Sequence, residues 1–308
     1  MEEPGGMRGF IEAMRACGEV IDIEEPVAVD FEAPRMAHQT DKLLMFHNLG
    51  GARGVMNVTA TRTALSRALS IPREEIVRRL SRAEYLGSVV REGTLPMARP
   101  DLRKIPVMQH FPCDAGKYIT AGIVFSRYGD TENASIHRML VLSEAKVAAR
   151  LVEGRHTATL HKAARENGDR LPVAVAIGVH PAVTIASCTR VPKGKELPYA
   201  AELLGGEIRV FQCPNGVLVP EAEIILEGYI GGETTSEGPF VDITGTYDIV
   251  REQPVIEFTG MHRAKDCIYH GILPAGNEHR MLMGAPYEPG IYRAVAAVTE
   301  VKDVVLTT

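Results

Sequence analysis

Apolar residues recur with helical spacing in two segments of the N-terminal third of the chain. The first segment, residues 10–17, ends before a glycine, and the second, residues 72–84, begins with a proline; both are usual helix boundaries. The apolar positions are Phe10, Ile11 and Met14 in the first segment and Ile76, Val77 and Leu80 in the second. Strand-like fragments lie between them, so we expect a small α/β domain over residues 1–108. Its end is marked by Pro96, Pro100 and Pro106.

Short runs of apolar and β-branched residues dominate from residue 122 onward. They predict strands at residues 123–126, 140–142, 172–179, 208–213, 224–226 and 255–258. Helical patterns interrupt them over residues 143–153, with Ser143 as N-cap, and over residues 157–167, followed by Gly168. Because the strands do not alternate regularly with helices, we expect a predominantly antiparallel barrel with inserted helices. The predicted fold class is therefore α+β.

Composition and charge narrow the class of protein. With 308 residues, 45% of them apolar, the chain can bury a large core in two or three folding units. A formal net charge of −5 argues against nucleic acid as a partner, because binding phosphates requires a basic face. The five cysteines are widely spaced, which argues against a disulfide framework or a thiolate zinc site. Without a signal-peptide pattern or an apolar run of about 18 residues, we expect a cytoplasmic protein with no membrane partner.

The segment ENASIHRMLVL, residues 132–142, places Asn133 and Arg138 in a predicted strand that leaves a polar turn. The two residues are separated by an odd step, so a regular strand would direct them to opposite faces of the sheet. A bend or bulge near Ser135 would be required for both to serve one cavity. The simpler interpretation is an asparagine in a turn and an arginine facing solvent.

Two later positions complete a candidate metal site with Asn133. Arg155 and His156 lie between the two predicted helices, and Glu196 opens another predicted helix in KGKELPYAAELLGG. An amide oxygen, an imidazole nitrogen and a carboxylate oxygen suit Mn²⁺ or Mg²⁺ better than zinc or calcium. The competing interpretation is structural: His156 would cap a helix, and Glu196 would favour a helix N-terminus through the macrodipole.

A pair of acids flanks a Gly-Pro turn in SEGPFVDITGTYD, residues 236–248. If Glu237 and Asp242 both approach Arg138, the paired carboxylate stays ionised, while the less paired and more desolvated one can hold a proton near neutral pH. This division suits general acid catalysis. The alternative is an exposed acidic loop.

The order and separations of these motifs resemble those of the UbiD-like reversible decarboxylases over nearly the whole chain. The stretches that carry the resemblance are FIEAMRACGEVIDIEEPV, NASIHR, RLVEGRH, PVAVAIGVHPA, KGKELPYAAELLGG, VPEAEIILEG and EGPFVDITG. The resemblance implies a split β-barrel, flavin-binding domain over residues 109–275. Residues 276–308 would then begin the C-terminal α/β domain into which family members normally continue. It further implies a homo-oligomer that receives its cofactor from a flavin prenyltransferase.

The resemblance also assigns ligands. Asn133, His156 and Glu196 would hold Mn²⁺, with Mg²⁺ in its place or K⁺ as further candidates, and the metal would bridge to the phosphate of prenylated FMN. A metal there would compensate a phosphate charge buried in a cleft. The residues implied to contact the flavin are Ile136, His137 and Arg138; Arg150, Leu151 and Val152, expected on a helix; Arg155 and His156; and Cys188, Thr189 and Arg190.

Catalysis is implied to rest on Arg138, Glu237 and Asp242. In the family the flavin accepts the electrons released as CO₂ leaves an unsaturated acid. The resemblance implies that Arg138, held by Glu237, orients the flavin-substrate adduct and that Asp242 donates the proton that replaces the carboxylate. Many members have Glu at the position of Asp242. The form with Asp resembles an archaeal branch of the family. Some of that branch decarboxylate an anhydromevalonate phosphate in isoprenoid synthesis, which makes trans-anhydromevalonate 5-phosphate the leading substrate.

Other functions remain open from the residues alone. The chain could act on an aromatic or acrylic acid within the same family, bind flavin without catalysis, or use the candidate metal site to activate water as a hydrolase. Retention of both Glu237 and Asp242 favours catalysis over binding alone. Cys188, as a lone thiol, is more typical of a small buried hydrophobe than of a nucleophile, and the run GGARG at residues 50–54 is typical of a turn.

Overall fold

The computed structural model describes residues 6–306 of the chain. Residues 1–5 and 307–308, and with them part of the N-terminal stretch judged to lack a signal peptide, lie outside the described residues. Within residues 6–306, no helix combines the length and apolar character needed to cross a membrane.

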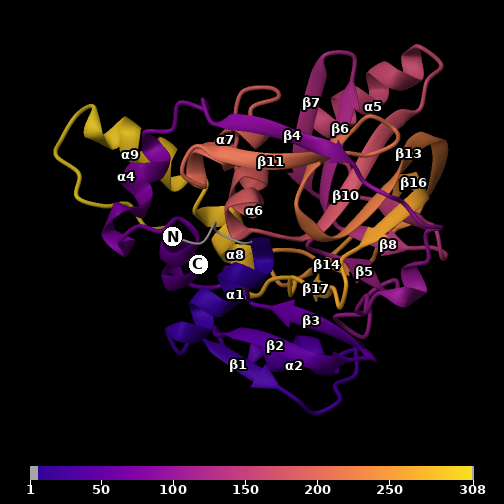
Figure 1. The fold of residues 1–308 in the computed structure, drawn as a ribbon, viewed down its shortest axis with the longest axis horizontal. Helices are drawn as coiled ribbons and strands as arrows, with labels where there is room; N and C mark the ends of the chain where they lie inside the picture. Colours follow the sequence, from indigo (N-terminus) through magenta and orange to yellow (C-terminus); the bar gives the residue numbers. More distant parts are fainter. Residues whose placement is uncertain (1–5, 307–308) are drawn as a thin grey trace.

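The largest element is an antiparallel sheet of eight strands (Figure 1). Its strands are β5 (Tyr118–Ile119), β6 (Ile123–Tyr128), β7 (Thr131–Ile136), β8 (Met139–Val141), β9 (Lys146–Ala149), β10 (Leu171–Val179), β13 (Ala222–Glu237) and β16 (Arg251–Arg263). Their order is β5-β8-β9-β16-β13-β10-β6-β7. The expected α+β class with a predominantly antiparallel sheet is thus confirmed.

Strand β10 shows why both faces of this sheet are covered. Its larger side chains, such as Val173 and Val175, pack into one hydrophobic core, whereas Ala174 and Ala176 belong to a second core on the opposite face. Helix α5 (His156–Glu166) packs in the first core, and α6 (Pro181–Cys188) and α7 (Glu196–Leu203) pack in the second. Helices α5, α6 and α7 each contact β7 as well, so this strand lies beside all three.

A smaller, mixed sheet is built mainly from strands of the N-terminal region, and this sheet lies in the lower part of Figure 1. The elements of this region are α1 (Gly6–Ala16), β1 (Val20–Ile23), α2 (Glu32–His38), β2 (Leu43–Leu49), β3 (Ala52–Met56), α3 (Arg62–Ala68), α4 (Ile76–Ser81) and β4 (Ser88–Thr94). Both predicted helices are present, as α1 and α4. Strand β17 (Ile268–His270) pairs with β3 and completes the order β1-β2-β3-β17. Residues far apart in the sequence therefore share this sheet.

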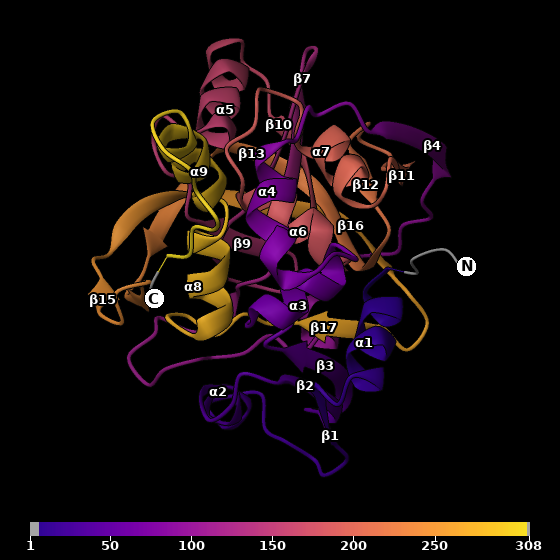
Figure 2. The ribbon, with the colours of Figure 1, turned by 90° about the vertical axis from the view of Figure 1, so that its left-hand side faces the viewer.

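The remaining strands form two small sheets, and two helices follow them. Strands β12 (Leu218–Pro220), β11 (Glu207–Gln212) and β4 form one sheet, and β14 (Phe240–Val241) and β15 (Tyr247–Asp248) form the other. Helices α8 (Asn277–Gly284) and α9 (Glu288–Ala296) pack beside α3 and α4 (Figure 2). The buried carboxylate of Glu278 in α8 accepts hydrogen bonds from the backbone N–H groups of Val58 and Thr59, at 3.1 and 3.0 Å. The C-terminal helices are thereby fixed to the N-terminal region.

The predicted helix over residues 143–153 is wrong. This segment instead contains β9, which pairs antiparallel with both β8 and β16. Val147, Ala148 and Ala149 are completely buried between these neighbours. Ser143 accepts a hydrogen bond from the N–H of Ala145 in a turn rather than capping a helix. Pairing in the sheet therefore overrides the helical propensity of SEAKVAARL, and residues 150–152 are not on a helix either.

Candidate active site

A buried ion pair joins Arg138 to Glu237, the last residue of β13. Strand β7 ends at Ile136 and β8 begins at Met139, so Arg138 lies in the link between them. Its Nε donates to Oε1 of Glu237 at 2.9 Å, and its Nη2 donates to Oε2 of the same residue at 2.9 Å. The side chains are 14% and 0% exposed. The interpretation of Arg138 as a solvent-facing residue is therefore wrong.

Arg138 also binds a second carboxylate, that of Asp248, which was not anticipated from the sequence. Oδ2 of Asp248 accepts from Nη2 of Arg138 at 3.1 Å and also pairs with Nη1 of Arg251 at 2.6 Å. Asp242 is exposed, in the turn between β14 and β15, where its Oδ1 accepts from the N–H of Ile243 at 2.7 Å. The structure thus brings Glu237 and Asp248 onto Arg138. Asp242 lies exposed in the adjoining turn, so the expectation that it is desolvated is wrong.

Aromatic rings shield this ion pair from water. The guanidinium of Arg138 lies 5.2 Å from the centre of the Phe240 ring, and that ring lies 4.1 Å from the ring of Tyr118. Burial and the nearby charge of Glu237 both raise the pKa of the Tyr118 hydroxyl. Tyr118 therefore stays neutral beside the ionised pair.

The strand carrying Asn133 is regular and has no bulge at Ser135. The pairing of β7 with β6 is unbroken from Thr131 to Ile136, and the chain leaves the sheet only at His137. Asn133, Ser135 and His137 therefore share one face, as the alternation of a strand requires. The link after β7, rather than a bulge within it, redirects Arg138.

This face of β7 is tied to the first turn of α5. Oγ1 of Thr157 lies 2.9 Å from both Nδ2 of Asn133 and Oγ of Ser135, and 3.2 Å from Nε2 of His137. Nδ1 of His137 lies 2.8 Å from the carbonyl oxygen of Arg150. Burial lowers the pKa of His137, so it is a neutral hydrogen-bonding group. Ser135 and Thr157 were missed in the sequence, although Ser135 occupies the position that strand alternation places between Asn133 and His137.

The three candidate metal ligands converge. Oδ1 of Asn133 lies 3.2 Å from Nδ1 of His156, which lies 3.8 Å from Oε1 of Glu196. The same Asn133 atom is 3.2 Å from Oε1 of Glu196. With oxygen in that position, three electron-pair donors face one another; with the amide turned over, its nitrogen donates to both neighbours. The first orientation is one that a cation between the three atoms would stabilise.

Electrostatics at Glu196 agree with this arrangement. Burial, together with the nearby charge of Glu132, raises the pKa of Glu196 to about 7. No group of three or more His, Cys, Asp or Glu side chains with metal-binding geometry occurs in residues 6–306, so the amide of Asn133 is essential to this candidate site. A hard divalent cation would restore the ionised carboxylate, and the mixed oxygen and nitrogen donors fit Mn²⁺ or Mg²⁺.

The residues implied to contact a flavin lie on three neighbouring segments. The segment from Ile136 to Arg138 is bonded to the next one, because the N–H of Arg150 donates to the carbonyl of Arg138 at 3.1 Å. Leu151 is buried, Val152 is exposed and Arg155 precedes α5. The third segment closes α6: burial raises the pKa of the Cys188 thiol to about 12, Thr189 bonds back to Ile185, and Arg190 lies over the ring of Tyr287. Cys188 is therefore a protonated thiol on a partly exposed residue.

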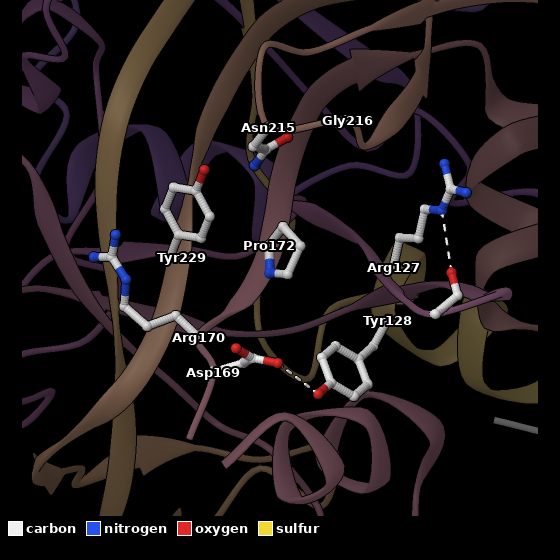
Figure 3. A pocket seen from close by; sticks show the side chains of 9 residues that line it. Arg127, Tyr128, Asp169, Arg170, Pro172, Asn215, Gly216 and Tyr229 are labelled. Atoms are coloured by element: carbon white, nitrogen blue, oxygen red, sulfur yellow. Dashed lines mark hydrogen bonds between the residues drawn. The ribbon is translucent and has the colours of Figure 1, made fainter. Parts of the chain in front are cut away.

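An open cavity of about 440 Å³ lies elsewhere, at the far end of β6 (Figure 3). Tyr128 lines it, whereas Ile123, at the other end of the strand, pairs with Ile136 beside Arg138; the two ends are about 17 Å apart at the usual rise per residue. Its polar groups largely satisfy one another: the Tyr128 hydroxyl donates to Asp169, and Arg170 lies over the ring of Tyr229. The charged and polar side chains gathered around Arg138 and around Glu196 are therefore a stronger candidate for the active site than this cavity.

Comparison with known families decides the relationship. Residues 11–84 match the 3-octaprenyl-4-hydroxybenzoate carboxy-lyase N-terminal domain, and residues 87–277 match the Rift-related domain of the same carboxy-lyase. The chain belongs to the UbiD family. Among curated UbiD relatives, it is 50% identical over 306 residues to the anhydromevalonate phosphate decarboxylase of Methanosarcina mazei, covering 97% of this chain and 72% of that protein. It is 49% identical to the enzyme of the same name from Archaeoglobus fulgidus, covering 84% of this chain and 62% of the relative.

Solved structures agree with membership of the UbiD family. An evolved dimeric form of the UbiD-class enzyme HmfF from Pelotomaculum thermopropionicum, in complex with prFMN, superposes with a TM-score of 0.93 at 31% identity. The match covers 98% of this chain and 75% of that chain. Apo 3,4-dihydroxybenzoic acid decarboxylase from Klebsiella pneumoniae shares the fold, with a TM-score of 0.88 at 21% identity over 95% of this chain and 70% of the other.

Proposed function

We propose that this UbiD-family chain is a carboxy-lyase that uses prenylated FMN to decarboxylate an α,β-unsaturated acid, with trans-anhydromevalonate 5-phosphate as substrate. The observation that carries the proposal is the buried, bidentate Arg138–Glu237 pair, with both Nε and Nη2 at 2.9 Å from the carboxylate. Identity of 50% and 49% to two anhydromevalonate phosphate decarboxylases supports the substrate. The prFMN complex of HmfF supports the cofactor.

The proposed metal ligands are Asn133, His156 and Glu196, holding Mn²⁺ or Mg²⁺. Their donor atoms already face one another, and the buried Glu196 carboxylate gains its charge compensation from a cation. The bound metal would neutralise the flavin phosphate. We propose that the eight-stranded sheet is a split-barrel, flavin-binding domain over residues 109–275, between an N-terminal domain of residues 1–108 and a region that begins at 276.

In this proposal the segments 136–138, 150–152, 155–156 and 188–190 hold the flavin. Two of them are already hydrogen-bonded to each other, through Arg150 N–H and Arg138 O and through His137 and Arg150 O. When bound, prenylated FMN supplies an electron sink for the pair left by departing CO₂. We infer that a flavin prenyltransferase supplies the cofactor and that the protein assembles with copies of itself.

Arg138 is proposed to orient the substrate carboxylate beside the flavin, and Glu237 fixes the direction of the guanidinium. The bond between the α-carbon and the carboxylate breaks, CO₂ leaves, and a proton from Asp242 forms the new bond to that carbon. Asp242 is suited to exchange protons with solvent because it is exposed in the β14–β15 turn. Glu237, fully buried and bonded to Arg138, remains the ionised partner.

The test compares the parent with Asp242→Asn after production with a flavin prenyltransferase and addition of Mn²⁺. We expect the variant to release CO₂ from anhydromevalonate phosphate about 100-fold more slowly, since positioned general acids contribute about 10²–10⁴-fold. Flavin absorbance and melting temperature should not change. Asp130→Asn, at an exposed turn between β6 and β7, is the control and should retain parent activity.

Other outcomes separate the competing functions. Turnover of aromatic or acrylic acids, but not of anhydromevalonate phosphate, would show that the chain is a UbiD-family decarboxylase with a different substrate. A parent that binds prenylated flavin without any CO₂ release would be a flavin-binding protein. Equal rates for the parent and Asp242→Asn would remove Asp242 from proton transfer, and Mn²⁺-dependent hydrolysis without flavin would replace the proposal altogether.

A further inference from the structure

The β14–β15 hairpin, residues 240–248, holds Arg138 from two sides. Phe240 and Asp248 are directly paired across the hairpin. The Phe240 ring centre lies 5.2 Å from the guanidinium of Arg138, and Asp248 Oδ2 lies 3.1 Å from its Nη2. One cross-strand pair thus places an aromatic face and a carboxylate on the same guanidinium.

Backbone pairing gives this hairpin little support, whereas the buried side chain of Phe240 packs with Tyr118, Leu140 and Ala148 of the large sheet. Within the described residues, β14 and β15 pair only with each other, through two residue pairs. Ile249 and Val250, which follow it, are 66% and 52% exposed. Further ties are the N–H of Ala115 to the carbonyl of Pro239 at 2.9 Å and the N–H of Cys113 to the hydroxyl of Tyr247 at 3.3 Å. On the β15 side, the ion pair of Asp248 ties the hairpin to Arg138.

The hairpin also carries Asp242, immediately after β14. The N–H of Asp242 donates to the carbonyl of Thr246 at 2.9 Å, and the N–H of Gly245 donates to the carbonyl of Asp242 at 2.9 Å. These bonds close the turn, so Asp242 and Asp248 belong to one small unit. A displacement of Asp248 relative to Arg138 therefore displaces Asp242 as well.

Asp248 is ionised, as an ion pair that holds the hairpin to Arg138 requires. Burial alone would raise its pKa, but hydrogen bonds from Arg251 and the Ile249 N–H, together with the charge of Arg138, hold the pKa below its usual range. A persistently ionised group is unsuited to donate a proton at neutral pH, so Asp248 is not itself a candidate proton donor.

We propose that Asp248 is a positioning residue, whose ion pair with Arg138 sets the distance between the β14–β15 hairpin and the substrate so that Asp242 reaches the reacting carbon. The inference rests on the proposed function, because it assigns Asp248 an effect exerted through Asp242. Misplacement of a reacting group by about 1 Å can cost about 100-fold in rate, so loss of this anchor has measurable consequences.

The test is a double-mutant cycle between Asp248→Asn and Asp242→Asn in the cofactor-loaded full chain. Asp248→Asn should lower kcat at least 10-fold with KM within about twofold of the parent. In the Asp242→Asn background the same change should have no further effect on kcat, because Asp242 no longer needs placing. A purely structural defect would lower kcat by the same factor in both backgrounds, and that result would overturn the proposal.

Matched variants separate anchoring from folding. Asp101→Asn removes a carboxylate with the same 17% side-chain exposure, also paired with an arginine but outside the site, and should retain parent kcat. Asp248→Glu keeps the charge and should recover most of the lost kcat. If Asp248→Asn fails to fold, Asp248→Ser, whose hydroxyl can still accept from the Ile249 N–H, replaces it in the cycle.

The result also distinguishes this inference from the proposed function. A parent protein with bound prenylated flavin and no CO₂ release contradicts the function itself. An active parent whose kcat is unchanged by Asp248→Asn contradicts only the positioning role.

Discussion

Replacing Arg138 by methionine is expected to lower kcat/KM for decarboxylation at least 1,000-fold and to destabilise the fold. The substitution removes the group proposed to hold the substrate carboxylate, an orienting effect that reaches several orders of magnitude in well-aligned reactions. It also leaves Glu237, which is 0% exposed, without its counter-ion. Breaking a buried pair by removing one partner costs about 3–5 kcal/mol of unfolding free energy. Denaturant unfolding and CO₂ release measure the two effects.

A double variant separates these effects. Arg138→Met with Glu237→Leu replaces both charges by apolar groups, which is often nearly neutral for stability at buried pairs. We therefore expect the unfolding free energy to return to within about 2 kcal/mol of the parent while activity stays absent. If the double variant regained activity together with stability, Arg138 would have a structural role only.

Replacing Glu196 by glutamine is expected to weaken Mn²⁺ binding about 1,000-fold, because the change removes the only charged donor among Asn133, His156 and Glu196 while leaving its size unchanged. Calorimetric titration of the flavin-free protein with Mn²⁺ at pH 8 measures the loss. Glu132→Gln, which removes a neighbouring carboxylate that is not a proposed ligand, is the matched control and should keep near-parent affinity. Equal affinities for the parent and Glu196→Gln would contradict the assigned ligand set.

The raised pKa of Glu196 gives this site a pH dependence of defined sign. Its pKa rises from 4.5 to about 7 on folding, so the metal-free folded state binds more protons than the unfolded state between these values. The metal-free protein should therefore lose stability as pH rises from 4.5 to about 7, by at most about 3 kcal/mol. Mn²⁺ binds the ionised carboxylate, so the rise in melting temperature caused by Mn²⁺ should be small at pH 5.5 and larger at pH 8. Glu196→Gln should abolish both trends.

Local patterns predicted the secondary structure well where one face or one period dominated. The helices at residues 6–16 and 76–81 and an apolar part of each long strand were found, but β13 and β16 extend over 16 and 13 residues, far beyond the predicted segments at 224–226 and 255–258. Their outer parts are polar, so the hydrophobic pattern gives no sign of pairing there. Residues 143–153 failed for a related reason: small residues with helical propensity become strand β9 only because β8 and β16 bury them on both sides.

The candidate site was predicted from sequence motifs. The site contacts that were not predicted depend on tertiary structure. The approach of Arg138 to Glu237 follows from the end of β7 and could not be read from spacing, which suggested a bulge at Ser135. Asp248 was overlooked because its contact with Arg138 arises from hairpin pairing with Phe240. Thr157, adjacent to His156, was overlooked because a buried hydroxyl between helix and strand has no distinctive sequence pattern.

The parallel pairing of β17 with β3 bears on how the chain is synthesised. The N-terminal sheet acquires its last strand only when residues 268–270 have left the ribosome, long after β1, β2 and β3. Until then the N–H and C=O groups along the free side of β3 are open to pairing with other nascent chains. Early termination upstream of Ile268 should therefore yield products that aggregate and engage chaperones, rather than an independently soluble N-terminal fragment.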